Sequence, residues 1–454
     1  MTDTPHELRV AVVGSGPSGF YAAEALLKAG ALVDVIERLP CPFGLVRSGV
    51  APDHPKLKTA IGVYEKIARH PGFNYIGNVT VGRDLTVQEL RESHHAVVFC
   101  HGAESDRRLG VPGEDLPGSH TATEFVGWYN GHPDYRDRQF DLSQEIAVIV
   151  GQGNVAADVA RILCKTADEL RETDISAHAL DALAASRIRE IHVVGRRGPA
   201  QAKFTSKELK EFGEFADCRA LVEGTDLELD AASAAEAADK SNPGVARNLE
   251  IFRALAAPAP AGARVCRFRF LLGPRALRGG TRVEAIDLEH NRLEGEPFNL
   301  SARGTGRIQA QPCGIVFRSI GYRGTAMAGL PFDERAAVVP NRAGAVLGAD
   351  GEPVPGLYTA GWIKRGPTGI IGTNRADAVE TVESLLADRD RLTAGARPGA
   401  QALYPLLASR GVRTLNFADW SRIDAAEVAL GKPRGKPREK FTRIAEMLAV
   451  LDRA

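Results

Sequence analysis

The amino-acid sequence predicts an α/β fold with two Rossmann-like domains, and three observations support this prediction. An apolar strand, a glycine-rich turn and a helix follow one another near the N-terminus, and the same succession returns near residue 151. The 454 residues are enough for about two to three domains. Apolar residues make up 44% of the chain and charged residues 25%, which is typical of a globular protein and argues against disorder, coiled coil and collagen.

The first domain is expected to open at residues 9–13, a short apolar run typical of a buried parallel strand. A glycine turn follows, and then a helical pattern over residues 20–29 that ends at Gly30, a suitable C-cap. Residues 32–36 predict the second strand and residues 96–100 the third. This is a β-α-β unit followed by a further strand.

The second domain repeats this opening after a polar segment, residues 103–118, which is the candidate crossover between the domains. Residues 145–150 predict a strand, and a helix is expected over residues 158–167 after the second glycine turn. Residues 191–194 predict the next strand, so that residues 168–187 must form an insertion.

The remaining segments are less regular. Residues 224–263, rich in Ala, Asp, Glu and Pro, predict a helix plus loop, and residues 264–320 alternate in a way that predicts an antiparallel meander. A strand is expected at residues 356–362 and a helix from near Asn374. The last seventy residues are expected to form helices that lie on the surface.

Charge and cysteine usage exclude several classes of protein. Lys and Arg together number 57, as do Asp and Glu, so the net charge does not indicate an affinity of the whole chain for nucleic acid or membrane. No apolar run approaches the length of about 18 residues that a membrane span needs, and the polar segment Met1–Leu8 predicts neither a signal nor a transit peptide. None of the six cysteines forms a C-x-x-C pair, which predicts free buried thiols, no metal site and a cytoplasmic location. They are Cys41, Cys100, Cys164, Cys218, Cys266 and Cys313.

The first glycine turn, Gly14-x-Gly16-x-x-Gly19, has the spacing of a dinucleotide-binding motif. The first glycine permits a sharp turn, the second lets a pyrophosphate approach the backbone, and the third lets the helix pack closely on the strand. Glu37 ends the second strand and can accept hydrogen bonds from both hydroxyls of an adenosine ribose. The motif therefore predicts a dinucleotide with an unphosphorylated ribose, the alternative being a glycine-rich turn without a ligand.

The second turn, Gly151-x-Gly153-x-x-Ala156, is followed at the next strand end by Arg196 and Arg197 instead of an acid. A carboxylate would repel a 2′-phosphate, whereas paired guanidiniums bind it bidentately. This site therefore predicts NADP(H), the alternative being a solvated basic turn. One site for each kind of ribose suggests FAD plus NADPH and redox transfer between them.

Four blocks give the chain a further resemblance. They are residues 42–55, 151–156, 194–199 and 361–374, and together they resemble the signatures of the adrenodoxin-reductase-type ferredoxin–NADP reductases, in particular the bacterial members. The resemblance implies that an NADP-binding domain is inserted into an FAD-binding domain. It implies FAD-binding parts at residues 1–105 and 325–454, the second with a helical C-terminal extension, and an NADP-binding domain at residues 106–324.

The resemblance also implies site residues. The implied FAD contacts are Gly14, Gly16, Pro17, Ser18, Gly19, Glu37, Leu45, Val81, Trp362, Gly369, Ile370 and Ile371. The implied NADP contacts are Arg107, Gln152, Gly153, Asn154, Val155, Arg196, Arg197, Glu208 and Gly369. The helix that starts near Asn374 is expected to direct its positive end at the flavin, where it would stabilise negative charge on the reduced ring.

Hydride transfer from NADPH to flavin requires proximity and alignment more than acid–base chemistry. His54 is the titratable residue inside a signature block, and it is the candidate for handling the flavin proton, with Glu211 as its candidate carboxylate partner. The alternative is a structural histidine that caps a turn. Asp158 is interpreted as an acid in the first turn of its helix, not as a catalyst.

A local basic patch is the candidate docking surface for a ferredoxin or similar small acidic electron carrier. Residues 187–210 hold seven basic side chains and two glutamates, although the NADP phosphate accounts for part of this charge. The stretch at residues 432–440 is interpreted as solvated surface. No basic stripe with interleaved aromatics predicts nucleic-acid binding, and a monomer is favoured.

Two other functions remain open. The chain could be a slow-turnover module that holds FAD and NADP and responds to redox state, or the reductase subunit of a larger amidotransferase-type complex. Such subunits usually carry an N-terminal cysteine-rich region, which Met1–Leu8 lacks. The missing C-x-x-C pair excludes a thioredoxin reductase.

Overall fold

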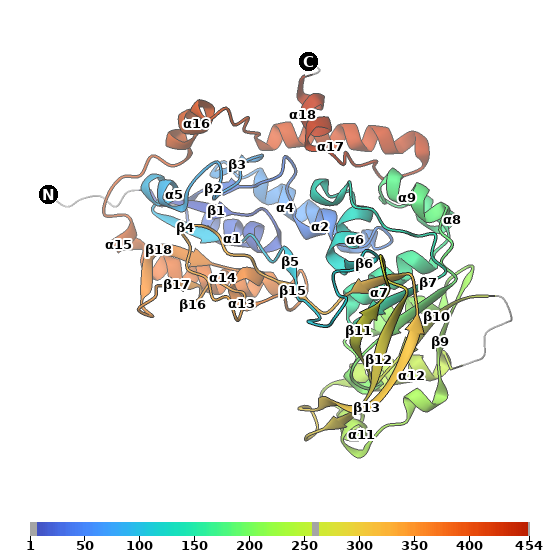
Figure 1. The fold of residues 1–454 in the computed structure, drawn as a ribbon. Coiled ribbons are helices and arrows are strands. Elements are labelled where there is room, and N and C mark those ends of the chain that lie inside the picture. The colour runs from blue at the N-terminus through green and yellow to red at the C-terminus, as the bar shows by residue number, and fades with distance from the viewer. Residues whose placement is uncertain (1–6, 257–262, 453–454) are drawn as a thin grey trace. The chain divides into compact units, whose positions relative to one another are not determined.

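The structure is a computed structural model, and it describes residues 7–256 and 263–452. Most of the segment Met1–Leu8 and the part of the predicted loop at residues 257–262 therefore lie outside the described residues. The chain forms two compact units. Unit 1 comprises Met1–Ser105, Gly321–Arg434 and Arg438–Ala454, and unit 2 comprises Asp106–Ile320 and Gly435–Pro437 (Figure 1).

Unit 1 is built on a seven-stranded sheet in the order β16-β17-β18-β4-β1-β2-β3. The five neighbouring strands β18, β4, β1, β2 and β3 are parallel, because each β-α-β connection returns the chain in the same direction, whereas β16 and β17 are antiparallel additions at one edge. Their apolar residues are buried on both faces, as a sheet covered on two sides requires. The strands are β1 (Arg9–Val13), β2 (Leu32–Ile36), β3 (Phe73–Ile76), β4 (Ala96–Phe99), β16 (Asn341–Arg342), β17 (Ala345–Leu347) and β18 (Pro353–Thr359).

Helices cover both faces of this sheet. On one face α1 and α14 pack with Val10, Val12 and the C-terminal helices, and on the other α5 and α16 pack with Ala11 and Val13. The helices of unit 1 are α1 (Pro17–Lys28), α2 (Leu45–Ser48), α3 (Pro55–Lys58), α4 (Ile61–Ala68), α5 (Val87–Ser93), α13 (Trp362–Arg365), α14 (Thr373–Ala387), α15 (Arg389–Leu392), α16 (Ala400–Ser409), α17 (Phe417–Gly431) and α18 (Ile444–Asp452).

The last seventy residues are helical, as predicted, but the prediction that they lie on the surface is wrong in part. Trp420, Ile423 and Met447 are buried in the same core as α1. The contribution of α17 to the core was not predicted, because the helix is mostly polar. A few apolar residues along one side of a helix are enough to cover the edge of a hydrophobic core.

Unit 2 is built on a six-stranded parallel sheet in the order β6-β14-β7-β8-β10-β9. Its helices pack on one face of the sheet against Ile149 and Val193. The strands are β6 (Ser119–Thr121), β7 (Ile146–Val150), β8 (Glu190–Val194), β9 (Cys218–Val222), β10 (Arg264–Arg269) and β14 (Ile315–Arg318). The helices are α6 (Ala122–Tyr129), α7 (Asn154–Cys164), α8 (Ala167–Arg171), α9 (Ala177–Ala184), α10 (Ser206–Lys210), α11 (Ala231–Ala238) and α12 (Pro243–Ala254).

The other face of this sheet is covered by an antiparallel meander of β11 (Leu272–Arg278), β12 (Ala285–Glu294) and β13 (Ser301–Pro312). The predicted meander at residues 264–320 is therefore too long, because β10 and β14 at its ends belong to the parallel sheet. Three arginines, Arg264, Arg267 and Arg269, lie along β10. They are compatible with an inner strand because they have partners, such as the Leu163 carbonyl 2.5 Å from Arg264 Nη2.

The predicted β-α-β elements are confirmed, but both of their helices begin earlier than expected. The first helix was expected over residues 20–29, whereas α1 covers Pro17–Lys28. The helix after the second glycine turn was expected over residues 158–167, but α7 covers Asn154–Cys164. The residues interpreted as the end of the turn already form the first helical turn. The inserted segment at residues 168–187 contains α8 and α9, and α14 begins one residue before the expected Asn374.

Candidate functional site

The first glycine turn joins β1 to α1, and its three glycines have different surroundings. A Cβ on Gly14 would lie 2.7 Å from the Cys100 carbonyl oxygen, and one on Gly19 would lie 2.0 Å from the Gly14 carbonyl oxygen. Gly14 also has a φ of +102°, which disfavours other residues. A Cβ on Gly16 would meet nothing within 4 Å. The fold thus requires the outer two glycines, and the middle one leaves a bare stretch of backbone open to a ligand.

That bare backbone stands at a helix N-terminus. Gly16 is the N-cap of α1 and no side chain caps the helix there, while Pro17 fills the position where an N–H is not needed. The N–H groups of the first turn and the helix dipole favour an anion at this place. The turn therefore fits the pyrophosphate of a dinucleotide.

Glu37 lies at the carboxyl end of β2, beside the glycine turn. Its carboxylate accepts hydrogen bonds from Ser15 N at 3.0 Å, Ser15 Oγ at 2.6 Å and Leu39 N at 3.0 Å. An ionised carboxylate offers about four acceptor positions, so these bonds orient the group without exhausting it. Glu37 is placed to accept from ribose hydroxyls.

The segment after β18 completes the same edge of the sheet, because β18, β4, β1 and β2 are neighbours and parallel. Gly361 has a φ of +82°, and a Cβ there would lie 2.3 Å from Ser18 Oγ. The Trp362 ring lies tilted against the Tyr322 ring, with 5.2 Å between their centroids, and Trp362 Nε1 donates to the Thr368 carbonyl at 3.1 Å. Ligands of open α/β sheets bind at this carboxyl edge.

A buried ion pair fixes this segment, and sequence reasoning missed it. Asp377 accepts a hydrogen bond from Gly361 N, and its other oxygen lies 3.2 Å from Nζ of the buried Lys364. The spacing of Lys364 and Asp377 matches no helical pair, since a loop separates their helices. No signal in the sequence could have identified the pair.

The other implied FAD residues are spread along the same unit. Leu45 begins α2 and is 38% exposed, whereas Val81 is buried. Gly369 has a φ of +81° in the loop before α14, where Ile370 is 69% exposed and Ile371 is half-buried. The N-cap of α14, Gly372, has no side-chain cap, but the N–H groups of the first turn already donate to the carbonyls of Ile370, Ile371 and Gly372.

The second glycine turn, in unit 2, repeats the pattern of the first. A Cβ on Gly151 would lie 2.0 Å from the Ser319 carbonyl oxygen, and its φ is +136°. A Cβ on Gly153 would meet nothing within 4 Å, and Gly153 is the uncapped N-cap of α7. Ala156, in the third position, is fully buried. The middle position is again open to a phosphate.

The side chains on either side of Gly153 bind the backbone of neighbouring segments in unit 2. Gln152 Nε2 donates to the Arg269 carbonyl at 3.0 Å, and Asn154 Oδ1 accepts from Thr205 N at 2.9 Å. The implied NADP contacts Gln152 and Asn154 thus already hold neighbouring backbone. Val155 is half-buried, and Arg107 is exposed.

The segment after β8 carries the arginine pair. Arg196 is exposed and Arg197 half-buried, and both line a cavity of about 290 Å³. Arg303, from β13, lines it as well. Sequence reasoning missed Arg303 because more than a hundred residues separate it from the pair.

Glu208, another implied NADP contact, belongs to a buried charge cluster in unit 2. The guanidinium of the fully buried Arg161 lies 2.8 Å from Glu208, 2.9 Å from Asp158 and 3.2 Å from Glu211. Because α7 starts at Asn154, Asp158 lies in its second turn, which corrects the prediction of a first-turn acid. The i, i+3 spacing of Asp158 and Arg161 was the available sequence signal for this pair.

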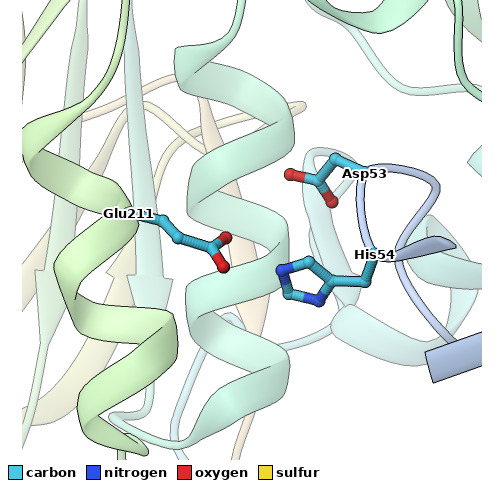
Figure 2. A group of neighbouring side chains, drawn as sticks. All are labelled: Asp53, His54 and Glu211. Carbon is cyan, nitrogen blue, oxygen red and sulfur yellow. The ribbon is translucent and has the colours of Figure 1, made fainter. Parts of the chain in front are cut away.

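His54 and Glu211 belong to different units. Figure 2 labels Asp53 and His54 on the loop that leads into α3, and Glu211 where α10 ends and a short 3₁₀ turn begins. His54 occupies the N-cap position of α3, but its side chain makes no cap hydrogen bond with the first turn. Its pairing with Glu211 and the alternative of a structural histidine that caps a turn both stay predictions.

The two basic stretches differ in their surroundings. Within residues 187–210, all seven basic side chains except the half-buried Arg197 are exposed: Arg187, Arg189, Arg196, Lys203, Lys207 and Lys210. The stretch at residues 432–440 is not simply solvated surface, which corrects that interpretation. Lys436 and Lys440 are buried, and Lys436 Nζ donates to the Ile175 carbonyl at 2.5 Å.

The comparisons with known proteins agree with this geometry. The family model described as pyridine nucleotide-disulphide oxidoreductase matches residues 8–212. The mitochondrial NADPH:adrenodoxin oxidoreductase of Salvelinus fontinalis is 44% identical to the chain, over 99% of the chain and 92% of the relative. The NADPH-ferredoxin reductase FprA of Mycobacterium leprae is also 44% identical, over 98% of the chain and 99% of the relative. The chain belongs to the adrenodoxin-reductase-type ferredoxin–NADP reductases. A solved structure of FprA from Mycobacterium tuberculosis is 42% identical, with a TM-score of 0.93, over 98% of this chain and 99% of that one.

Membership of this family settles the fold class and the cofactors. The two Rossmann-type parallel sheets are those of the family, and FAD and NADP(H) are its cofactors. The two open glycine positions and the contrast between Glu37 and the arginine pair fit these groups. Among the described residues, no helix is long and apolar enough to cross a membrane.

Proposed function

We propose that the chain is a ferredoxin–NADP(+) reductase that passes electrons from NADPH through FAD to a ferredoxin-like carrier. The observation that carries this proposal is the contrast between the two glycine turns. The first has Glu37 at the next strand end, and the second has Arg196 and Arg197. A pair of guanidiniums at this strand end favours a 2′-phosphorylated ribose over an unphosphorylated one, so we expect the second turn to select NADP(H).

The chain's own residues bind and align the two nucleotides. Unit 1 is assigned as the FAD-binding part, with the turn at Gly14–Gly19, Glu37 and the segment after Gly361 along one sheet edge. Unit 2 is assigned as the NADP-binding domain through Gly153 and the arginine pair. Bound FAD supplies the exchange between two-electron and one-electron transfer. Alignment, not a nucleophile, is what the protein contributes.

His54 is assigned the role of holding a proton near the flavin, with Glu211 as its partner. We expect His54→Gln to change the pH dependence of flavin reduction by NADPH, because glutamine cannot exchange a proton. Stopped-flow reduction over a range of pH measures this. An unchanged profile would remove the proposed role and leave His54 structural.

The electron carrier is assigned as small and acidic. The exposed basic side chains of residues 187–210 support this choice, because clustered positive charge accelerates association with an acidic partner. A monomer in the cytoplasm remains the favoured form, and the six free, buried cysteines agree with a reducing compartment.

An anaerobic titration of the purified holoprotein with NADPH and then with NADH tests the proposal. We expect stoichiometric NADPH to bleach the flavin spectrum and NADH to be far less effective. Reduction of cytochrome c through added ferredoxin then separates a turning-over reductase from a slow redox-responsive module. A colourless protein, or a flavin that neither nucleotide reduces, would contradict the proposal.

A further inference from the structure

The cavity beside the arginine pair contains a third arginine from a different part of the chain. It has a volume of about 290 Å³ and lies entirely within unit 2. Its lining combines the turn after β8 with the start of β13: Arg196, Arg197, Leu300, Ser301, Ala302 and Arg303. A Rossmann sheet supplies the first part of this wall, but the second comes from the added meander.

Direct hydrogen bonds connect the meander to the segment after β8 that carries Arg196 and Arg197. Asn291 Nδ2, from β12, donates to the Arg196 carbonyl at 2.9 Å, and Leu271 N, just before β11, donates to the Arg197 carbonyl at 2.9 Å. Both bonds use backbone carbonyls of the pair, and they leave its guanidiniums available. The meander therefore holds Arg303 in a defined place next to the pair.

The charge of Arg303 is only weakly compensated by the protein. Its Nε lies 3.6 Å from Glu294 Oε2, and its side chain is 67% exposed. The same Glu294 is bonded more closely by Arg292, at 2.7 Å. A long, exposed ion pair of this kind contributes little, so Arg303 can turn to a stronger anion at small cost.

A phosphate monoester suits this arrangement. It carries about −1.5 to −2 charges near neutral pH and three acceptor oxygens, which is more than two guanidiniums neutralise. We propose that Arg303 is a third ligand of the NADP 2′-phosphate and therefore a specificity-determining residue of the second nucleotide site. This inference rests on the proposed assignment of Arg196 and Arg197 to that phosphate.

Binding of adenosine 2′,5′-bisphosphate to the oxidised holoprotein, measured by calorimetry, tests the inference with AMP as the unphosphorylated probe. We expect Arg303→Gln to weaken the bisphosphate about tenfold to a hundredfold, the range of one lost charged hydrogen bond, and to leave AMP unchanged. Arg303→Lys, which keeps the charge but not the fork, should give an intermediate loss. Inorganic phosphate should compete only weakly, because the ribose contacts are missing.

Arg307→Gln is the matched control. Arg307 lies on the same strand and has its own partner, with Nη2 2.7 Å from His290 Nδ1, and it does not line the cavity. We expect wild-type binding from this variant, which excludes a general effect of removing positive charge from β13.

Two outcomes would overturn the inference. In the first, Arg303→Gln binds the bisphosphate as the wild type does, while Arg197→Gln binds it clearly more weakly. Arg303 would then not be a ligand of the 2′-phosphate, and the proposed function would stand. An equal loss for AMP and the bisphosphate would show that Arg303 shapes the fold and not the phosphate site. If Arg197→Gln also binds normally, the assignment of the arginine pair itself fails.

Discussion

Single residues of the two glycine turns divide into those that the fold needs and those that a ligand needs. Gly14, Gly19 and Gly151 approach neighbouring backbone more closely than any Cβ allows. Gly16 and Gly153 have empty space where a side chain would be. The second group has no structural reason to be glycine, which is the physical basis for placing a pyrophosphate at both positions.

We expect Gly151→Ala and Gly153→Ala to separate these two roles. The first forces a Cβ to within 2.0 Å of the Ser319 carbonyl oxygen at a φ of +136°, and it should lower the free energy of unfolding by roughly 2 kcal/mol or more. Gly153→Ala should unfold like the wild type in urea but bind NADP more weakly in calorimetry. Normal NADP affinity in Gly153→Ala would contradict the proposed phosphate position.

Because of His101, we expect the free energy of unfolding of the protein to depend on pH. Burial lowers the pKa of His101 from about 6.5 to about 4, so that the folded protein keeps this imidazole neutral where the unfolded chain protonates it. Between these two values the unfolded state binds more protons, and stability falls as the pH falls, by up to about 1.4 kcal/mol per pH unit. His101→Gln should remove this slope. Urea unfolding of both proteins between pH 4.5 and 7.5 measures it, and parallel curves would contradict the prediction.

At the scale of elements, helix α17 braces the short helix α2, which contains the predicted FAD contact Leu45. Arg47, two residues after Leu45 in α2, pairs with the fully buried Glu427 of α17 at 2.9 and 2.5 Å. Its guanidinium also lies 4.9 Å from the centre of the Trp420 ring. Glu427 in turn accepts from Phe441 N at 3.0 Å, which connects the last segment of the chain.

We expect Glu427→Ala to destabilise the protein by about 3–5 kcal/mol, because it leaves a buried guanidinium without its partner. Because Arg47 shares α2 with Leu45, the same variant should release FAD faster, which flavin fluorescence reports. Asp452→Asn is the control, since it breaks an exposed pair with Arg413 and should change stability by less than about 1 kcal/mol. If the Glu427→Ala variant is stable and retains its flavin, the ion pair with α17 is not needed to hold α2 in place.

The same scale shows how far sequence reasoning reaches. Apolar runs and glycine spacing predicted the first strands of both sheets and both turns, because these signals are local. The starts of α1 and α7 were both misplaced by about one turn, since in each case the glycine motif itself forms the helix N-terminus. Asp377, Glu427 and Arg303 could not be predicted, because each acts on a residue far away in the sequence or in another element.

For the molecule as a whole, the fold decides the chemistry of the cysteines. The sequence scatters six thiols, yet the structure brings Cys164, Cys218 and Cys266 into one core of unit 2, where Cys164 and Cys218 interact. All six are free and buried, as predicted. Burial raises the pKa of Cys313 to about 12, and it raises the pKa of Cys41, Cys100 and Cys164 as well. Contact with Cys164, followed by burial, raises that of Cys218.

A thiol titration with an aromatic disulfide reagent tests this property in the intact holoprotein. Only a thiolate attacks the reagent, and both burial and a raised pKa suppress the thiolate, so we expect no rapid reaction at pH 8. In denaturant all six thiols should react, which serves as the internal control. One or two fast equivalents in the native protein would identify an accessible thiol and contradict the buried core. Slow reaction of all six thiols at one common rate would instead report global unfolding, because a buried thiol then reacts only when its unit opens.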